Sequence, residues 1–70
     1  MNYNHIIYLR KELDKIKILF KKGEFKLVIK KSKALLKKNP NQTIIYNYIC
    51  LSYIQLNEIE NALEIFLLSL

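Results

Sequence analysis

Apolar side chains in the second half of the chain recur with the spacing of an α-helix, and this spacing constrains the fold more than any other feature. Two consecutive sets follow the spacing i, i+3, i+4, i+7: Tyr46, Ile49, Cys50 and Tyr53, and then Ile59, Ala62, Leu63 and Phe66. Each set therefore lies along one face of a predicted helix. Between the two sets, Asn57 tolerates the left-handed backbone conformation at which many helices end. The pattern predicts an antiparallel helical hairpin whose helices come closest at the small residues Cys50 and Ala62.

A partial copy of this pattern lies about 34 residues earlier in the chain, which is a period typical of helical-hairpin repeats. Six positions of the first copy correspond to positions 34 residues later in the second. The pairs are Leu19 and Tyr53, Phe20 and Ile54, Gly23 and Asn57, Phe25 and Ile59, Val28 and Ala62, and Ile29 and Leu63. Gly23 and Asn57 occupy the same place, and we expect both to end a helix with a positive φ. The first copy departs from the second at four positions: Glu12, Lys15 and Ser32 replace large apolar residues, and Ile16 replaces a small one. Polar residues on the outer side of a first repeat are consistent with capping.

The second copy resembles the tetratricopeptide repeat, a helix–turn–helix motif with this period. The resemblance rests on Tyr46-x-x-Ile49-Cys50-x-x-Tyr53 and Ala62-x-x-x-Phe66, and on Pro40, which stands where the family has its closing proline. It covers a first repeat over about residues 9–42 and a second over about residues 43–70. It implies an all-α fold in which one domain, residues 1–70, consists of two antiparallel helical hairpins stacked as a short α-solenoid.

The resemblance also implies a function and a set of contact residues. In tetratricopeptide proteins the first helix of each repeat lines a groove that holds a peptide or a partner protein, which implies a non-enzymatic scaffold. The corresponding residues are Arg10, Leu13 and Lys17 in the first repeat and Asn47, Tyr48, Leu51 and Gln55 in the second. The side chain of Asn47 has both the donor and the acceptor that a peptide backbone requires. The alternative is that Tyr48 and Leu51 only pack against the protein itself.

The composition is that of one small helical domain. Seventy residues allow only a thin core, and a content of 51% hydrophobic residues with one Gly and one Pro disfavours disorder and most β architectures. A single cysteine cannot form an internal disulfide, which favours a reducing compartment. The sequence contains no segment typical of a signal peptide or of a membrane span. These features predict a cytoplasmic protein.

The hydrophobic pattern predicts four helices, over about residues 5–22, 24–38, 42–56 and 58–70, with residues 1–4 frayed. Asn41 is expected to cap the third helix, and Glu58 and Glu60 to lie in the favourable first turn of the fourth. In the first two helices, the residues predicted to face inward are Ile6, Leu9, Leu13, Ile16, Phe20, Phe25, Val28, Ile29, Leu35 and Leu36.

No combination of residues in the sequence is typical of a catalytic centre or a metal site. His5 is the single histidine and lies near the N-terminus, where a surface role is expected. Cys50 has no second thiol to pair with, so burial as a small hydrophobic residue is favoured over a reactive role. The sequence has no glycine-rich phosphate loop. We therefore expect no enzyme activity, no metal and no cofactor.

Positive charge is concentrated in the first half of the chain. Residues 10–38 carry a net charge of about +9, and the residues after them about −3. One face of the second predicted helix carries Lys26, Lys30, Lys33 and Lys37, flanked by Lys22, Lys31 and Lys38. Such a row could bind nucleic acid, which is the alternative function. A solvated helix face is favoured instead, because the chain has a single Arg and no aromatic residue interleaved with the row.

The end of the chain is unusually apolar. If Ile59, Leu63 and Phe66 pack within their own hairpin, Leu67 and Leu70 must face outward and form an uncovered patch. We therefore predict a bound partner or a homodimer that forms through this end, with Leu67 and Leu70 in the interface. A further possibility is that the repeats begin a larger architecture.

Overall fold

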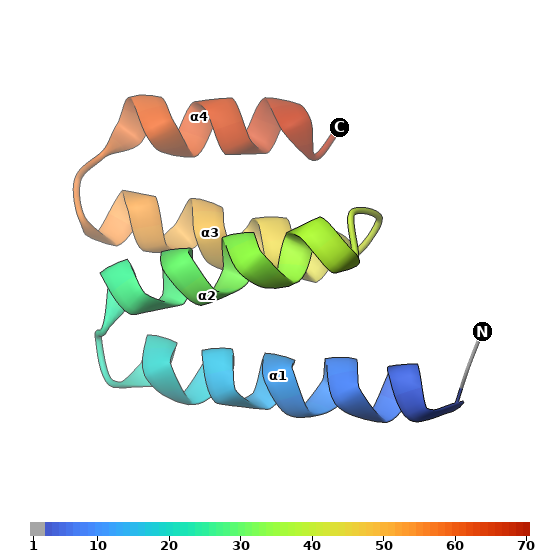
Figure 1. Ribbon diagram of the computed structural model, residues 1–70. Coiled ribbons are helices and arrows are strands. Elements are labelled where there is room, and N and C mark those ends of the chain that lie inside the picture. Colours follow the sequence, from blue (N-terminus) through green and yellow to red (C-terminus); the bar gives the residue numbers. More distant parts are fainter. Residues whose placement is uncertain (1–2) are drawn as a thin grey trace.

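The computed structural model describes residues 3–70, which form four α-helices joined by short turns (Figure 1). The helices are α1, Tyr3–Lys21; α2, Phe25–Lys38; α3, Thr43–Gln55; and α4, Ile59–Leu68. Residues 3–70 contain no strand, so the all-α prediction is confirmed. Residues 3 and 4 were expected to be frayed and instead form the first turn of α1. Residues 1 and 2 lie outside the described part of the chain.

The two turns that close the hairpins have the same geometry and lie at equivalent positions of the two repeats. Gly23 ends α1 with φ 79°, and Asn57 follows α3 with φ 61°, as predicted. Both residue types adopt a positive φ at low cost. The hydrogen bonds also correspond: Gly23 N–H donates to Phe20 O and Glu24 N–H to Leu19 O in the first turn, and Asn57 N–H donates to Ile54 O and Glu58 N–H to Tyr53 O in the second. This double closure is a Schellman motif, so one kind of turn produces both hairpins.

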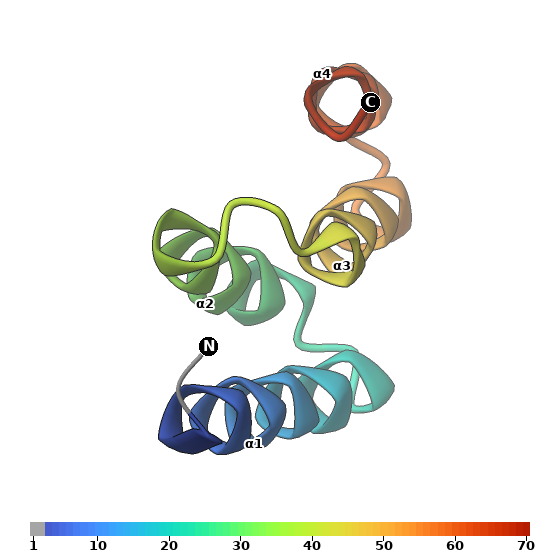
Figure 2. The same cartoon turned by 90° about the vertical axis from the view of Figure 1, so that its right-hand side faces the viewer.

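The helices are arranged so that α3 is the central element. Consecutive helices alternate in direction (Figure 1), and the end-on view shows α2 beside α3, with α1 and α4 on opposite sides of this pair (Figure 2). α3 packs against all three other helices, whereas α4 packs against α3 alone. The second hairpin is therefore attached to the first through α3.

The core is formed by branched aliphatic side chains where α1, α2 and α3 meet. Ile16, Val28, Ile45 and Ile49 are almost completely buried there. Leu9, Ile29 and Leu35 complete the cluster, and Leu13, Phe20 and Leu36 pack against it. Most residues predicted to face inward do so, but Ile6 is exposed. Ile6 lies near the start of α1.

Two serines are also buried in the helices, which the hydrophobic pattern did not indicate. Ser32 on α2 and Ser52 on α3 are completely inaccessible, and neither hydroxyl has a hydrogen-bond partner among the described residues. Burying an unpaired hydroxyl costs free energy, but a small side chain lets neighbouring helices approach closely. Their small size is consistent with their complete burial within the closely packed helices.

Asn39 organises the connection between the two hairpins. Its backbone N–H donates to the carbonyls of Leu35 and Leu36, and its side-chain Nδ2 donates to Leu35 O at 3.0 Å. Its Oδ1 accepts a hydrogen bond of 2.9 Å from Nε2 of His5 on α1. These bonds satisfy a buried amide that would otherwise be costly.

The predicted cap of α3 was wrong. The N-cap residue is Gln42 rather than Asn41, and no side chain caps the helix. The helix begins one residue later because the backbone carbonyl of Asn39 holds the amide of Gln42 in a preceding turn. In α4, Glu60 lies in the first turn as expected, whereas Glu58 is the N-cap residue. The Glu58 carboxylate accepts a hydrogen bond from Asn61.

The repeated turn geometry makes a prediction about backbone strain. A Cβ atom at residue 23 would meet Phe25 Cε2 at an ordinary 3.9 Å, so a substitution there is strained by its φ rather than by a clash. We expect Gly23→Val to lower the free energy of unfolding by about 1 kcal/mol or more in urea or thermal unfolding. The matched variant Asn57→Gly, at the same place in the second hairpin, should not be destabilised by φ. Equal stabilities of wild type and Gly23→Val would contradict the positive φ at the end of α1.

Candidate partner-binding face

The contact between α3 and α4 is set by two small residues. Ala62 is buried, and its carbonyl accepts a hydrogen bond from the Cys50 thiol, with an S–O distance of 3.5 Å. The predicted close approach of Cys50 and Ala62 is confirmed. Ile65, one turn further along α4, is half-buried against the core. The side of α4 that faces α3 therefore contains Ala62 and Ile65.

The prediction that Ile59, Leu63 and Phe66 pack within their own hairpin was wrong. Their exposed fractions are 55%, 56% and 51%. The apolar stripe of α4 is wide, and sequence spacing alone does not say which part of it meets α3. Because the closest approach is at Ala62, the larger side chains on its flank extend beyond the contact and remain accessible to solvent.

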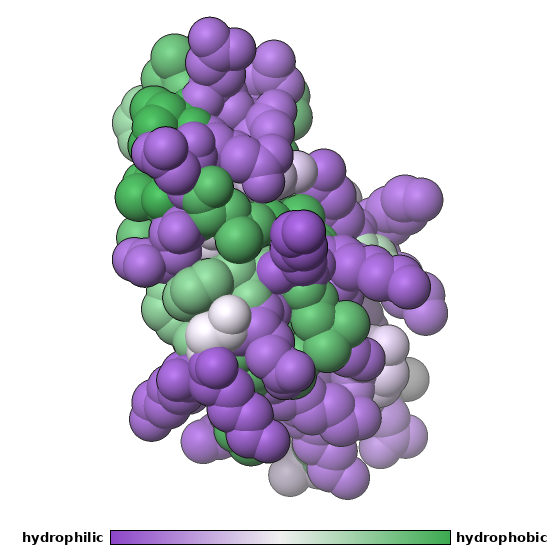
Figure 3. Space-filling view, turned by 90° about the vertical axis from the view of Figure 1, so that its left-hand side faces the viewer, coloured by the Kyte–Doolittle hydropathy of each residue, from purple (hydrophilic) through white to green (hydrophobic). Residues whose placement is uncertain are grey.

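These exposed side chains form one wall of an apolar groove. We define the α3–α4 groove by the residues that line it: Cys50 and Ile54 on α3, and Ile59, Ala62, Leu63 and Phe66 on α4. The groove has a volume of about 340 Å³, and none of its lining residues is charged. Figure 3 shows hydrophobic side chains gathered along one edge of the half of the molecule that contains α3 and α4, whereas the half with α1 and α2 is mostly hydrophilic. Such a contiguous apolar surface is typical of an interaction site.

Leu67 and Leu70 are exposed, as the prediction for the end of the chain requires. Their exposed fractions are 58% and 87%, but neither lines the α3–α4 groove. The sequence thus predicted the exposed leucines at the end of the chain but not the α3–α4 groove beside them. The small size of Ala62 did indicate the close contact, but the sequence does not show on which side of that contact the large residues Ile59, Leu63 and Phe66 lie.

The seven residues that the family resemblance assigned to a peptide groove lie on α1 and α3, and one of them, Leu13, is instead half-buried against the core. Arg10 and Lys17 on α1, and Asn47 and Gln55 on α3, have exposed side chains. Leu51 is 46% exposed, so the alternative that it only packs is not supported. Tyr48 is half-buried and makes an edge-to-face contact with Phe20, with 5.7 Å between ring centroids. Tyr48 therefore has a packing role that connects the two repeats.

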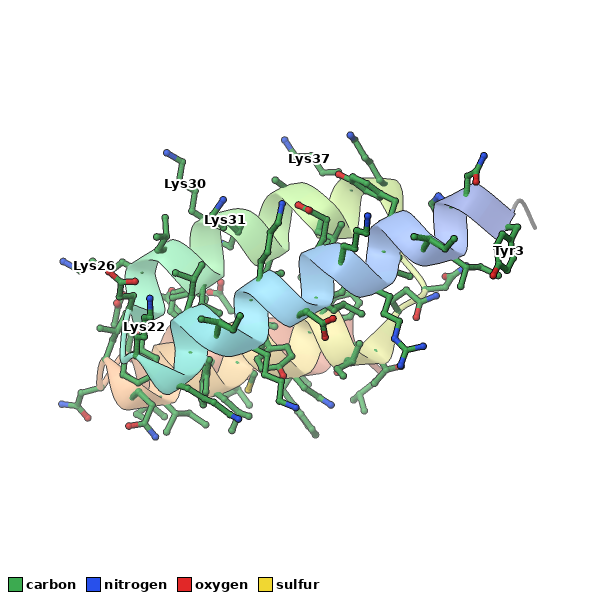
Figure 4. All side chains as sticks on the ribbon, turned by 90° about the horizontal axis from the view of Figure 1, so that it is seen from below. Tyr3, Lys22, Lys26, Lys30, Lys31 and Lys37 are labelled. Atoms are coloured by element: carbon green, nitrogen blue, oxygen red, sulfur yellow. The ribbon has the colours of Figure 1, made fainter. Side chains whose placement is uncertain are left out.

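The lysines of α2 are all exposed, and several point away from the body of the protein. Lys26, Lys30 and Lys37 project outward along α2 (Figure 4). Lys33 and Lys38 instead lie over aromatic rings, with Nζ 5.3 Å from the ring centroid of Tyr53 and 5.8 Å from that of Tyr8. No sequence pattern indicates these cation–π contacts, because each lysine and its ring belong to different helices. They hold two of the lysines against the protein's own surface.

The histidine and the cysteine, the other side chains considered for chemistry, both make hydrogen bonds within the protein. The His5 ring is half-buried and bonded to Asn39, and the Cys50 thiol is bonded to the Ala62 carbonyl. Within residues 3–70, no three His, Cys, Asp or Glu side chains come together in a way that could bind a metal ion. None of the helices in this part of the chain is both long and apolar enough to cross a membrane.

The close contact between Cys50 and Ala62 gives a stability prediction. Enlarging the buried Ala62 side chain should push α4 away from α3, so we expect Ala62→Leu to lower the free energy of unfolding by about 1–3 kcal/mol. Ala34→Leu is the matched control, because Ala34 is exposed on α2 and should change stability by less than about 0.5 kcal/mol. Denaturant unfolding followed by circular dichroism measures both. If the two variants were equally stable, Ala62 would not be the closest contact.

Comparisons of the chain with protein-family models, with curated proteins and with solved structures found no match.

Proposed function

We propose that the chain is a non-enzymatic protein-interaction module built from two tetratricopeptide-type repeats, and that it binds a partner protein through the α3–α4 groove. The observation that carries this proposal is the exposure of the groove's large apolar residues. Ile54, Ile59, Leu63 and Phe66 each expose 45% or more of their surface on one face. Leaving such a face in water is unfavourable, and a protein partner that covers it gains the free energy of its burial.

The repeat geometry supports the tetratricopeptide part of the proposal. Two helical hairpins closed by the same turn, one repeat period apart, are what this repeat family consists of. In such arrays a repeat buries its apolar side by stacking against a neighbouring helix. The second hairpin of this chain offers that side without a cover.

A second surface of the same module consists of α1 and α3, the first helices of the two repeats. Arg10, Lys17, Asn47, Leu51 and Gln55 are exposed there and offer charged, amide and apolar groups. An extended peptide would find hydrogen-bond partners on this surface but little enclosure. The α3–α4 groove is the better candidate, because apolar area removed from water provides most of the free energy of protein association.

The alternative function is nucleic-acid binding through the lysine row of α2. It is supported by the outward direction of Lys26, Lys30 and Lys37 (Figure 4). Binding of this kind is electrostatic, so its affinity must fall steeply as the salt concentration rises. The two proposals therefore use different faces and respond differently to salt.

Site-specific photo-crosslinking in the native cell tests the proposal. A photoreactive phenylalanine analogue at Phe66 reports on the α3–α4 groove, and the same analogue at Lys30 reports on the lysine row. We expect discrete protein adducts from position 66 and none from position 30. Nucleic-acid adducts from position 30, without protein adducts from position 66, would favour the alternative. The control is the analogue at Leu68, which is 71% exposed and does not line the groove.

A further inference from the structure

The α3–α4 groove is a second copy of a surface that is already covered in the first hairpin. One repeat period earlier, its six lining residues correspond to Ile16, Phe20, Phe25, Val28, Ile29 and Ser32. In the first hairpin four of these are buried and the two phenylalanines are half-buried. Ile16, Val28 and Ile29 share one core cluster with Ile45 and Ile49 of α3. On the first hairpin this surface is therefore the place where α3 packs.

Because α3 covers the equivalent surface of the first hairpin, its properties indicate what kind of helix fits the α3–α4 groove. α3 is an α-helix of 13 residues without a charged side chain. It presents Ile45 and Ile49 to the first hairpin, and both are completely buried, as is Ser52, three residues after Ile49. This spacing of four and three residues is that of one helix face. The α3–α4 groove thus fits a helix whose contact face is apolar and uncharged over about two turns.

The first helix of another copy does not meet this requirement. In α1, the residues that correspond to Ile45, Ile49 and Ser52 are Lys11, Lys15 and Ile18. Lys11 and Lys15 are exposed, and Lys15 forms an ion pair of 3.0 Å with Glu12. Placing α1 in the groove would bury two ammonium groups against apolar side chains, which is strongly unfavourable. Copies of the chain therefore cannot stack head to tail as an open filament.

The helix of this chain that does meet the requirement is α4. Ile59, Leu63 and Phe66 follow one another at spacings of four and three residues, and all are exposed. Glu60 and Glu64 lie roughly 100° further round the helix than Ile59 and Leu63, so they stay in solvent when this stripe is covered. The same face thus carries both a groove and an apolar ridge, which makes it complementary to itself.

From these observations we infer that the occupant of the α3–α4 groove is a second copy of this chain, with α4 of each copy in the groove of the other about a two-fold axis. This inference rests on the proposed function, because it names the partner of the same site. A two-fold arrangement closes the assembly at two copies, because each copy uses the same surface and the exposed Lys11 and Lys15 keep α1 out of the groove. The contact residues are then Ile59, Leu63 and Phe66 rather than Leu67 and Leu70 alone.

Sedimentation of the full chain at micromolar concentration tests the inference. We expect a dimer whose association is weakened at least about tenfold by Leu63→Asp, because a carboxylate would be buried in the groove. Leu68→Asp is the matched control: it changes the same residue type on the same helix, away from the groove, and should leave the dimer intact. Added salt should not weaken the association of the two copies. If the copies instead associated through their basic and acidic halves, added salt would weaken the association.

Two further readouts keep the result unambiguous. Phe66→Ser introduces the residue found at the corresponding position of the first hairpin, and it should weaken the dimer without placing a charge in the groove if Leu63→Asp fails to fold. In the purified protein, the photoreactive analogue at position 66 should crosslink to α3 or α4 of the second copy. Crosslinks to α1 would overturn the two-fold arrangement.

A wild-type chain that stays monomeric over the whole concentration range would overturn the inference. If position 66 then crosslinked a different protein in the cell, the proposed function would stand with another occupant. If position 66 crosslinked no protein in either experiment, the proposed function would fail as well.

Discussion

The burial of α3 against α1 and α2 is the interaction on which the rest of the structure depends. Ile45 and Ile49 lie completely buried against Ile16 and Val28. Each such side chain contributes about 1.5–3 kcal/mol when it is removed from water. Because α4 contacts no helix except α3, the second hairpin has its place in the molecule only through this contact. A thin core of this kind provides only a small free energy of folding, so covering the exposed apolar face would add appreciably to the stability of the chain.

The repeated hairpin connects this packing contact to the proposed function. The two hairpins share their turn geometry and the positions of their groove residues, yet only the first has its apolar side covered. The molecule is therefore asymmetric along the stack: α1 has exposed lysines, Lys11 and Lys15, where α3 has buried isoleucines, and α3 and α4 leave an apolar groove open. One closed end and one open end favour a finite complex over a growing chain.

Much of the fold could be predicted from the sequence, because local signals determine it. Gly23 and Asn57 mark the turns through their tolerance of positive φ, and the apolar spacing locates all four helices. The rotation of α4 about its axis could not be predicted, because Ala62, Leu63 and Phe66 belong to one wide stripe. The cation–π contacts of Lys33 and Lys38 depend on tertiary packing and leave no local pattern. The candidate groove was missed for the same reason as the rotation of α4.

Amide hydrogen exchange, measured as the protein is diluted, tests most directly whether the α3–α4 groove holds a second copy. An uncovered α4 that packs against a single helix should exchange faster than α3 does. The account predicts that the amides of α4 and of residues 50–54 are protected at high concentration and lose protection on dilution, while those at the outer face of α1 do not change. Protection of α4 that is independent of concentration would contradict it.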